Sequence, residues 1–268
     1  MLLRRTLENG TRFEPPCHFE ISAAKRKQIM RVPVLTDFVK KTTCTAKLDC
    51  ASTNQEWCKE LAEKLGIKEV EGYSIYITRW GQTLSLNNTG GAREGKGMHL
   101  MDAISKLDAK APQDTKDFTQ ISGQLSFRRE FFSATYDPAN DPVGTELTYH
   151  QLQTQIHDGL FLCDTDDEWN HMVAQMYYVE RGDVMDEAEL HTWTTLCLPP
   201  SALKGKQTAE SRGPIIEKIH AKAEYCKKQW PKAKVMGEVV KFALAHWSSA
   251  QTFDANAPRV LSPNGSLQ

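Results

Sequence analysis

The sequence has no excess of charge of either sign and no long apolar run. Its 33 Lys and Arg residues nearly balance its 34 Asp and Glu residues, which gives a formal net charge of -1 over 268 residues. A generally basic nucleic-acid-binding protein is therefore excluded, and we expect no nucleic-acid partner. The apolar stretch at the N-terminus is too short for a signal peptide, and no stretch reaches the length of a membrane-spanning helix. These absences predict a cytoplasmic chain.

Closely spaced metal-binding or disulfide-forming residues are also missing. The cysteines are odd in number, and no two have the Cys-x-x-Cys spacing; they lie at positions 17, 44, 50, 58, 163, 197 and 226. The eight histidines form no His-Glu-x-x-His or other short metal-binding pair. We therefore expect reduced thiols, no structural zinc and no bound metal.

Little in the sequence indicates catalysis. It contains no Gly-x-Ser-x-Gly elbow, and its acidic cluster at 164–168 has the pattern of a helix cap. One loop, Gly90–Gly97, fits the spacing of a phosphate-binding loop, with Lys96 as the residue that would reach the phosphates. The next position is Gly97, where magnesium coordination requires Ser or Thr. We predict a protein without catalytic residues or cofactor, and keep a P-loop-like nucleotide-binding protein as an alternative.

The first part of the chain has the pattern of a small lobe of strands and a helix. Residues 27–36 and 42–50 are rich in β-branched side chains and flank a turn-like segment, which predicts a hairpin. The capping box formed by Thr53 and Glu56 predicts the start of a helix. Alternation of apolar and polar residues from Tyr73 onward predicts a half-buried strand. Hairpin, helix and strand in this order predict a β-grasp, or ubiquitin-like, lobe.

The second half of the chain is helical in pattern. A second capping box at Thr165–Glu168 predicts another helix start. Pro214 and Pro231 are each predicted to open a helix, since proline in the first turn loses no hydrogen bond. Residues 108–123 and 248–268 lack periodicity, and we expect a linker in the first segment and a disordered tail in the second. The predicted fold class is α+β, with a ubiquitin-like β-grasp lobe followed by an all-helical lobe.

Lysine residues gather where the last two predicted helices meet. Four of them, Lys227, Lys228, Lys232 and Lys234, surround this junction. A cluster of this kind attracts anionic lipid head groups or an acidic protein segment such as a tubulin tail. The alternative is an ordinary solvated helix surface, because a run of charge usually does no more than solvate a helix. These four lysines are the candidate site for an anionic partner, and the solvated surface is kept as its alternative.

Beginning with the segment at 15–21, several segments taken in order resemble the tails of unconventional myosins, in which a myosin tail homology 4 (MyTH4) domain runs into a FERM domain. The junction Pro15-Pro16-Cys17-His18-Phe19-Glu20-Ile21 resembles the Pro-Pro-x-x-x-Glu-hydrophobic junction of that family. Further segments that resemble it lie at 61–67, 71–76, 101–105, 127–132, 147–152 and 234–242. Their order and spacing from Met1 to Trp247 make the resemblance specific, and it is strongest to class-seven myosins.

The resemblance implies a domain order. Residues 1–20 correspond to the end of the myosin tail homology domain or to a linker, and 21–110 to the ubiquitin-like first FERM lobe. A linker over 111–123 leads into an acyl-CoA-binding-protein-like helical lobe over 124–247, followed by the disordered tail. The family's third lobe does not follow, so we expect a chain truncated before it.

The resemblance also implies a function. A tail region of this kind is a non-catalytic cargo-binding adaptor of an actin-based motor, associated with the cytoskeleton. Its expected partners are cytoskeletal scaffold proteins or the cytoplasmic tails of membrane proteins. A FERM scaffold or a kinesin-type tail without a myosin head remains the alternative within the binding class.

Overall fold

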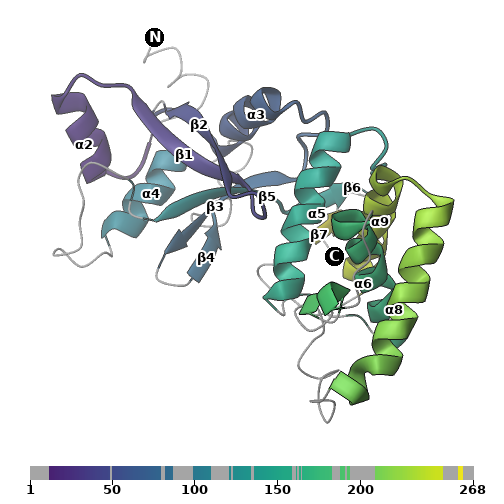
Figure 1. Cartoon of the computed structure of the whole chain (residues 1–268). Helices are drawn as coiled ribbons and strands as arrows, with labels where there is room; N and C mark the ends of the chain where they lie inside the picture. Colours follow the sequence, from purple (N-terminus) through teal and green to yellow (C-terminus); the bar gives the residue numbers. More distant parts are fainter. Residues whose placement is uncertain are drawn as a thin grey trace. The chain divides into compact units, whose positions relative to one another are not determined.

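The described part of the chain falls into two units, the first ending at Glu130 and the second beginning at Phe131 (Figure 1). In the computed structural model the described residues are 12–48, 50–79, 82–86, 99–109, 121, 123–133, 136–158, 161, 163, 165–182, 188–190, 192–193, 209–249 and 259–261. The glycine-rich loop Gly90–Gly97 and most of the predicted linker lie outside these residues.

The first unit is a five-stranded sheet with helices. Its elements, in chain order, are α2 (His18–Lys25), β1 (Met30–Asp37), β2 (Thr42–Leu48), α3 (Asn54–Leu65), β3 (Tyr73–Arg79), β4 (Gln82–Ser85), α4 (Leu100–Ala109) and β5 (Gln124–Arg129). The strands follow the order β2-β1-β5-β3-β4; β1 is parallel to β5, and the other neighbours are antiparallel. This is the strand order of a β-grasp, so the fold predicted for this unit is confirmed.

Helix α3 begins and ends where the sequence predicts. The Thr53 hydroxyl accepts a hydrogen bond from the Glu56 N–H, and the Glu56 carboxylate accepts one from the Thr53 N–H. Gly66 ends the helix at φ +79°, a left-handed conformation that glycine adopts without strain. Trp57 and Leu61 are buried, which anchors α3 in the core of the unit.

Strand β5 corrects the predicted domain boundary. Its residues, Gln124–Arg129, were assigned to the second lobe, but they pair with both β1 and β3 in the centre of the first sheet. Leu125 and Phe127 enter the core from one face and lie opposite Ile77 and Ile75. The linker prediction over 108–123 is also wrong at its start, because α4 continues to Ala109.

Two smaller predictions for the first unit are wrong as well. The boundary predicted between residues 20 and 21 falls inside α2, because that helix begins at His18. Strand β3 is buried on both faces rather than half-buried, since Ser74 and Tyr76 are as enclosed as Ile75. The alternation in the sequence is broken by Tyr76, and burial on both faces fits a strand that has neighbours on both sides.

The second unit is built around a helical core. Its elements are β6 (Phe131–Ser133), α5 (Pro142–His157), α6 (Asp166–Arg181), α8 (Ala209–Gln229), α9 (Lys232–Ser249) and β7 (Arg259–Leu261). Helix α6 packs against both α8 and α9, and α9 also packs against α5 (Figure 1). The Thr165–Glu168 capping box starts α6 as predicted. Trp169, Met176 and Val239 are buried in one apolar core.

The structure changes three predictions for this unit. Pro214 lies inside α8, beyond its first turn, where the missing N–H removes one helix hydrogen bond. Pro231, in contrast, immediately precedes α9 as predicted. The tail is not wholly disordered and the unit is not all-helical, because Arg259–Leu261 forms a strand parallel to Phe131–Ser133. Pairing with a distant strand orders these tail residues although their own sequence has no period.

Candidate functional site

The predicted lysine cluster lies where α8 turns into α9, and we call residues Tyr225–Lys234 the α8–α9 corner. Proline ends α8 because Pro231 has no N–H and disfavours helical geometry at the preceding residue. The Pro231 carbonyl then accepts hydrogen bonds from the N–H groups of Lys234 and Val235, at 2.9 and 3.2 Å, and so begins α9. The sequence therefore produces a short, sharp connection between two long helices.

Helix α6 holds this corner in place. The hydroxyl of Tyr178 donates a hydrogen bond of 2.9 Å to the carbonyl oxygen of Trp230. Cys226 and Val235, on either side of the turn, are fully buried in the core of the unit. The corner is therefore fixed by one polar bond from α6 and by apolar packing on both of its helices.

The four predicted lysines all lie in the corner, but their surroundings differ. Lys227, Lys228 and Lys234 are exposed, whereas Lys232 is half-buried. The stem of Lys232 passes close to Gly182, where an added Cβ would lie 2.8 Å from the lysine Cε. Packing against the end of α6 gives Lys232 a structural role, so three of the four lysines remain as exposed candidates.

Two aromatic residues complete the corner, and the sequence analysis missed their part in it. Tyr225 is 58% exposed, although its ring lies 6.5 Å from the half-buried Trp230 ring at an angle of 83°. The Lys234 ammonium lies 5.1 Å from the centroid of the same Trp230 ring, within range of a cation–π interaction. Tyr225 lies three residues before Lys228 on α8, which places both side chains on one helix face. That spacing is the signal that a sequence analysis could have used.

Lysines just outside the corner form ion pairs with acidic side chains. Lys222 forms an ion pair of 2.8 Å with Asp167, and this hydrogen bond lowers the pKa of the Asp167 carboxyl. Burial, together with the Lys222 charge, lowers the pKa of His171 on the same surface. Lys241, on α9, pairs with Glu238 at 3.7 Å. Within the corner itself, from 225 to 234, the sequence contains no Asp or Glu.

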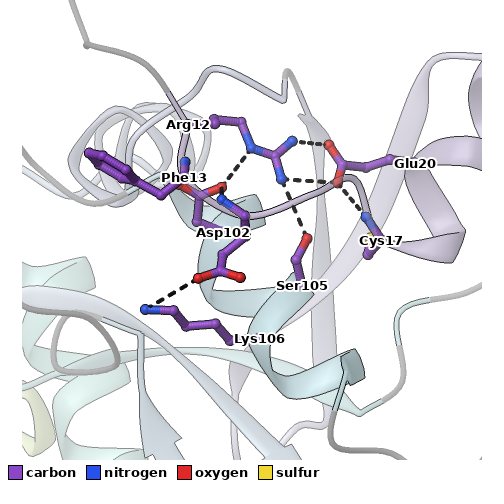
Figure 2. A network of polar contacts seen from close by, with 8 residues as sticks. Arg12, Phe13, Cys17, Glu20, Asp102, Ser105 and Lys106 are labelled. Atoms are coloured by element: carbon purple, nitrogen blue, oxygen red, sulfur yellow. Dashed lines mark hydrogen bonds and ion pairs between the residues drawn. The ribbon is translucent and has the colours of Figure 1, made fainter.

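A second polar cluster, in the first unit, joins the segment before α2 to α4 (Figure 2). The Arg12 guanidinium donates from Nε to Asp102 Oδ1 at 2.8 Å and also pairs with Glu20. A weaker contact of 3.4 Å joins Arg12 to the Ser105 hydroxyl. Burial would lower the pKa of Arg12, but the hydrogen bonds to Glu20 and Asp102 outweigh this effect and raise it. We call Arg12, Glu20 and Asp102 the Arg12 clamp.

Backbone groups strengthen the Arg12 clamp. The second oxygen of Asp102 accepts the N–H of Phe13 at 3.0 Å, and Glu20 accepts the N–H of Cys17 at 2.9 Å. Both carboxylates are therefore engaged with the segment that precedes α2, which gives the clamp a structural role. The sequence offers no signal for it, because Arg12 and Asp102 are 90 positions apart.

The described residues offer neither a metal-binding cluster nor a membrane span. Nowhere in the described ranges do three His, Cys, Asp or Glu side chains lie close enough together to hold a metal ion. Over those same ranges no helix combines the length and the apolar character needed to cross a bilayer. The α8–α9 corner and the Arg12 clamp are thus the polar features considered for a functional role.

Comparison with known proteins relates the chain to motor proteins. A family model described as an RA like domain matches residues 31–131. Unconventional myosin heavy chain 6 of Caenorhabditis elegans is 37% identical over 209 residues, which are 77% of this chain and 9% of the relative. Myosin-VIIa of Drosophila melanogaster is 30% identical over 246 residues, 91% of this chain and 11% of the relative. A kinesin-like protein of Oryza sativa, KIN-14I, is 24% identical over 72% of this chain and 16% of its own length.

The fold has solved counterparts in the same group. The C-terminal MyTH4-FERM domain of human myosin 7b, in complex with the harmonin-a PDZ3 domain, has a TM-score of 0.64 and 18% identity. The similarity covers 91% of this chain and 48% of that structure's chain. The chain spans about a tenth of the length of the two myosins it matches. Sequence and fold together place this chain among the FERM-type regions of unconventional myosin tails.

Proposed function

We propose that the chain is a non-catalytic cargo-binding region of an actin-based motor, which links cytoskeletal scaffold proteins to that motor. The observation that carries this proposal is the sequence identity to two unconventional myosins over most of the chain. Because the chain spans only a small part of those proteins, the activity of the whole motor is not assigned to it. Its expected location is the cytoplasm, in association with the cytoskeleton.

A scaffold protein is the partner class that the comparisons support best. The myosin 7b MyTH4-FERM domain with the same fold is in complex with a PDZ domain of the scaffold harmonin-a. A kinesin-type tail is less favoured, because the kinesin-like relative is less similar in sequence than the two myosins. The cytoplasmic tails of membrane proteins form the second partner class in the proposal.

Binding to a defined scaffold domain tests the proposal. The purified chain is titrated with the harmonin-a PDZ3 domain in a calorimeter, and saturable binding is the expected result. The control is the chain after heat denaturation, which has lost its native surface and should show no saturable binding. Failure of the folded wild-type chain to bind the domain would contradict the scaffold assignment.

Thermal stability with nucleotide tests the competing P-loop interpretation. A ligand present at a hundredfold excess over its dissociation constant raises the apparent stability by about 2.7 kcal/mol. We expect no such change with magnesium and ATP, because position 97 is glycine where a phosphate-binding loop needs Ser or Thr. A shift that disappears in a Lys96→Ala variant would support the nucleotide-binding alternative instead.

A further inference from the structure

We propose that strand β2 is a docking edge for an acidic, extended segment of a partner protein, which adds to the first sheet as a further strand. Arg31 on β1 and Lys47 on β2 supply the positive charge, and outward-facing backbone groups of β2 supply the hydrogen bonds. We call Arg31, Thr43, Thr45 and Lys47 the basic edge. The proposal goes beyond the scaffold-binding function and does not depend on it, because that function assigns no surface of the first unit.

Strand β2 lies at one end of the five-stranded sheet, next to β1. The strand at the other end, β4, has only four residues, and none of them is charged. Strand β2 has seven residues, so it offers the longer template for a further strand. An extended peptide that adds to a sheet edge gains affinity from backbone hydrogen bonds and specificity from its alternate side chains.

A proline in β1 leaves the carbonyl of Thr45 turned away from that strand. Pro33 lies opposite Thr45 in the antiparallel register and has no N–H to donate to this carbonyl. The carbonyl instead accepts a hydrogen bond of 3.2 Å from the ammonium of Lys64, on α3. Because hydrogen-bonded and non-bonded pairs alternate along an antiparallel ladder, Thr43 and Lys47 turn their backbone groups in the same direction as Thr45. Three residues of β2 therefore present N–H and C=O groups at the open edge.

Two positive charges lie directly opposite each other beside this edge. Arg31 faces Lys47 in the register of β1 and β2, and both side chains are exposed. Like charges in directly opposite positions destabilise an antiparallel pair. The segment 28–48 contains a single carboxylate, that of Asp37. Asp37 is buried and accepts two backbone N–H groups of the turn, at 3.0 and 2.8 Å, so a partner with carboxylates would relieve the repulsion that Asp37 does not.

Protection of the edge against aggregation does not account for both charges. A lysine on an edge strand commonly prevents pairing with another sheet, and Lys47 by itself meets that need. Arg31 belongs to the inner strand β1, where a second positive charge adds repulsion without covering the edge. Lys64 contributes less charge, because it pairs with Glu60 on its own helix. A row of carboxylates gives both Arg31 and Lys47 a role, and a second copy of this chain, with the same positive charge on its β2, would not supply that row.

Titration with a synthetic peptide tests the proposal. The peptide alternates Glu with Thr, so that its carboxylates all lie on one face when it is extended. Nuclear magnetic resonance of the nitrogen-15-labelled full chain follows the titration. The amide signals of Thr43, Thr45 and Lys47 should shift, and those of β4 should not. A peptide with Gln in place of Glu should bind more weakly, and added salt should weaken binding of the Glu peptide, because the Debye length is only about 8 Å at physiological ionic strength.

A double variant tests the charges of the basic edge. Each exposed ion pair strengthens an interaction about twofold, so changing Arg31 and Lys47 to Gln should weaken binding of the Glu peptide about fourfold. The same variant should unfold at a higher urea concentration than the wild type, because the repulsion between opposite positions is gone. The charge-matched control changes Lys227 and Lys228, exposed on α8, to Gln and should bind the peptide as the wild type does.

The variant Thr45→Pro tests the backbone. Proline removes the outward N–H and leaves the hydrogen bonds between β1 and β2 in place, so binding should weaken more than about tenfold. The matched control Thr45→Val keeps the N–H and the branched shape of the side chain, and it should bind as the wild type does. Circular dichroism confirms that each variant is folded; if Thr45→Pro does not fold, the charge variants still decide the outcome.

Three outcomes would overturn the proposal. The first is equal affinity of the wild type for the Glu and Gln peptides. The second is a set of shifted amide signals at the α8–α9 corner or at β4 instead of at the basic edge. The third is a double variant of Arg31 and Lys47 that self-associates in sedimentation but binds the Glu peptide as the wild type does. That result would mean the two charges only protect the edge against aggregation.

Discussion

Replacement of Arg12 by Met should destabilise the first unit, because it leaves two carboxylates without their cation. The side chains of Glu20 and Asp102 are each only 7% exposed, and that of Arg12 is 16% exposed. Removal of one partner from a fully buried ion pair costs about 3–5 kcal/mol. Solvent reaches Arg12 in part and screens the interaction, so we expect a loss of about 2 kcal/mol in the free energy of unfolding.

Hydrogen exchange measures this loss locally. Amide exchange in α2 and α4 should become about 30-fold faster in the variant, since every 1.4 kcal/mol corresponds to a factor of ten. The control is Lys106→Met, also on α4, which breaks the more exposed 3.6 Å pair with Glu14. That pair is expected to contribute less than about 1 kcal/mol.

A double-mutant cycle tests the reasoning behind the number. Asp102→Asn keeps the shape of the side chain and removes its charge, so its effect and that of Arg12→Met should not be additive. We expect a coupling energy above about 1 kcal/mol between the two positions. Additive effects, or a loss for Arg12→Met no larger than that for Lys106→Met, would refute a stabilising role for the Arg12 clamp.

Three further changes have expected outcomes. Thr165→Ala removes the cap of α6 and should lower the free energy of unfolding by about 1 kcal/mol in urea denaturation; no change would mean the helix does not depend on this cap. Tyr178→Phe removes the hydrogen bond to Trp230 and should cost about 1 kcal/mol, seen as faster amide exchange at the α8–α9 corner but not in α5. Burial raises the pKa of Cys17 to about 11 and of Cys58 to about 12. These thiols ionise more readily in the unfolded chain, so their contribution to stability should be constant below about pH 9 and should be lost as the pH rises toward 11 and 12. Replacing both by Ala should flatten that fall.

Local signals in the sequence predicted local structure. The capping boxes at Thr53 and Thr165 start helices because a cap needs only residues three positions apart. Pro231 correctly predicted the start of α9. Pro214 did not mark the start of α8, because packing of buried residues such as Ile219 holds the helix on both sides of the proline. Tertiary contacts decide whether a proline starts a helix or lies inside it, and the neighbouring residues in the sequence do not reveal those contacts.

The sequence did not predict features that join residues far apart along the chain. Strand β5 has an alternating pattern, with Leu125 and Phe127 buried, but only its pairing with β1 and β3 assigns it to the first unit. For the lysine cluster, the sequence identified the charge and its position at a helix junction. The support from Tyr178 depends on how α6 packs beneath that junction, which no spacing along the chain records.

The central position of β5 has a consequence for how the first unit is made. The strand synthesised last lies in the middle of the sheet, between β1 and β3. Until it emerges, the earlier strands can form only two separate hairpins, β1 with β2 and β3 with β4. Parallel pairing of chain segments this far apart is slow, because the loop must close before the contact stabilises it. A recombinant piece that stops at residue 110 or 123 would therefore lack the strand that unites its two halves.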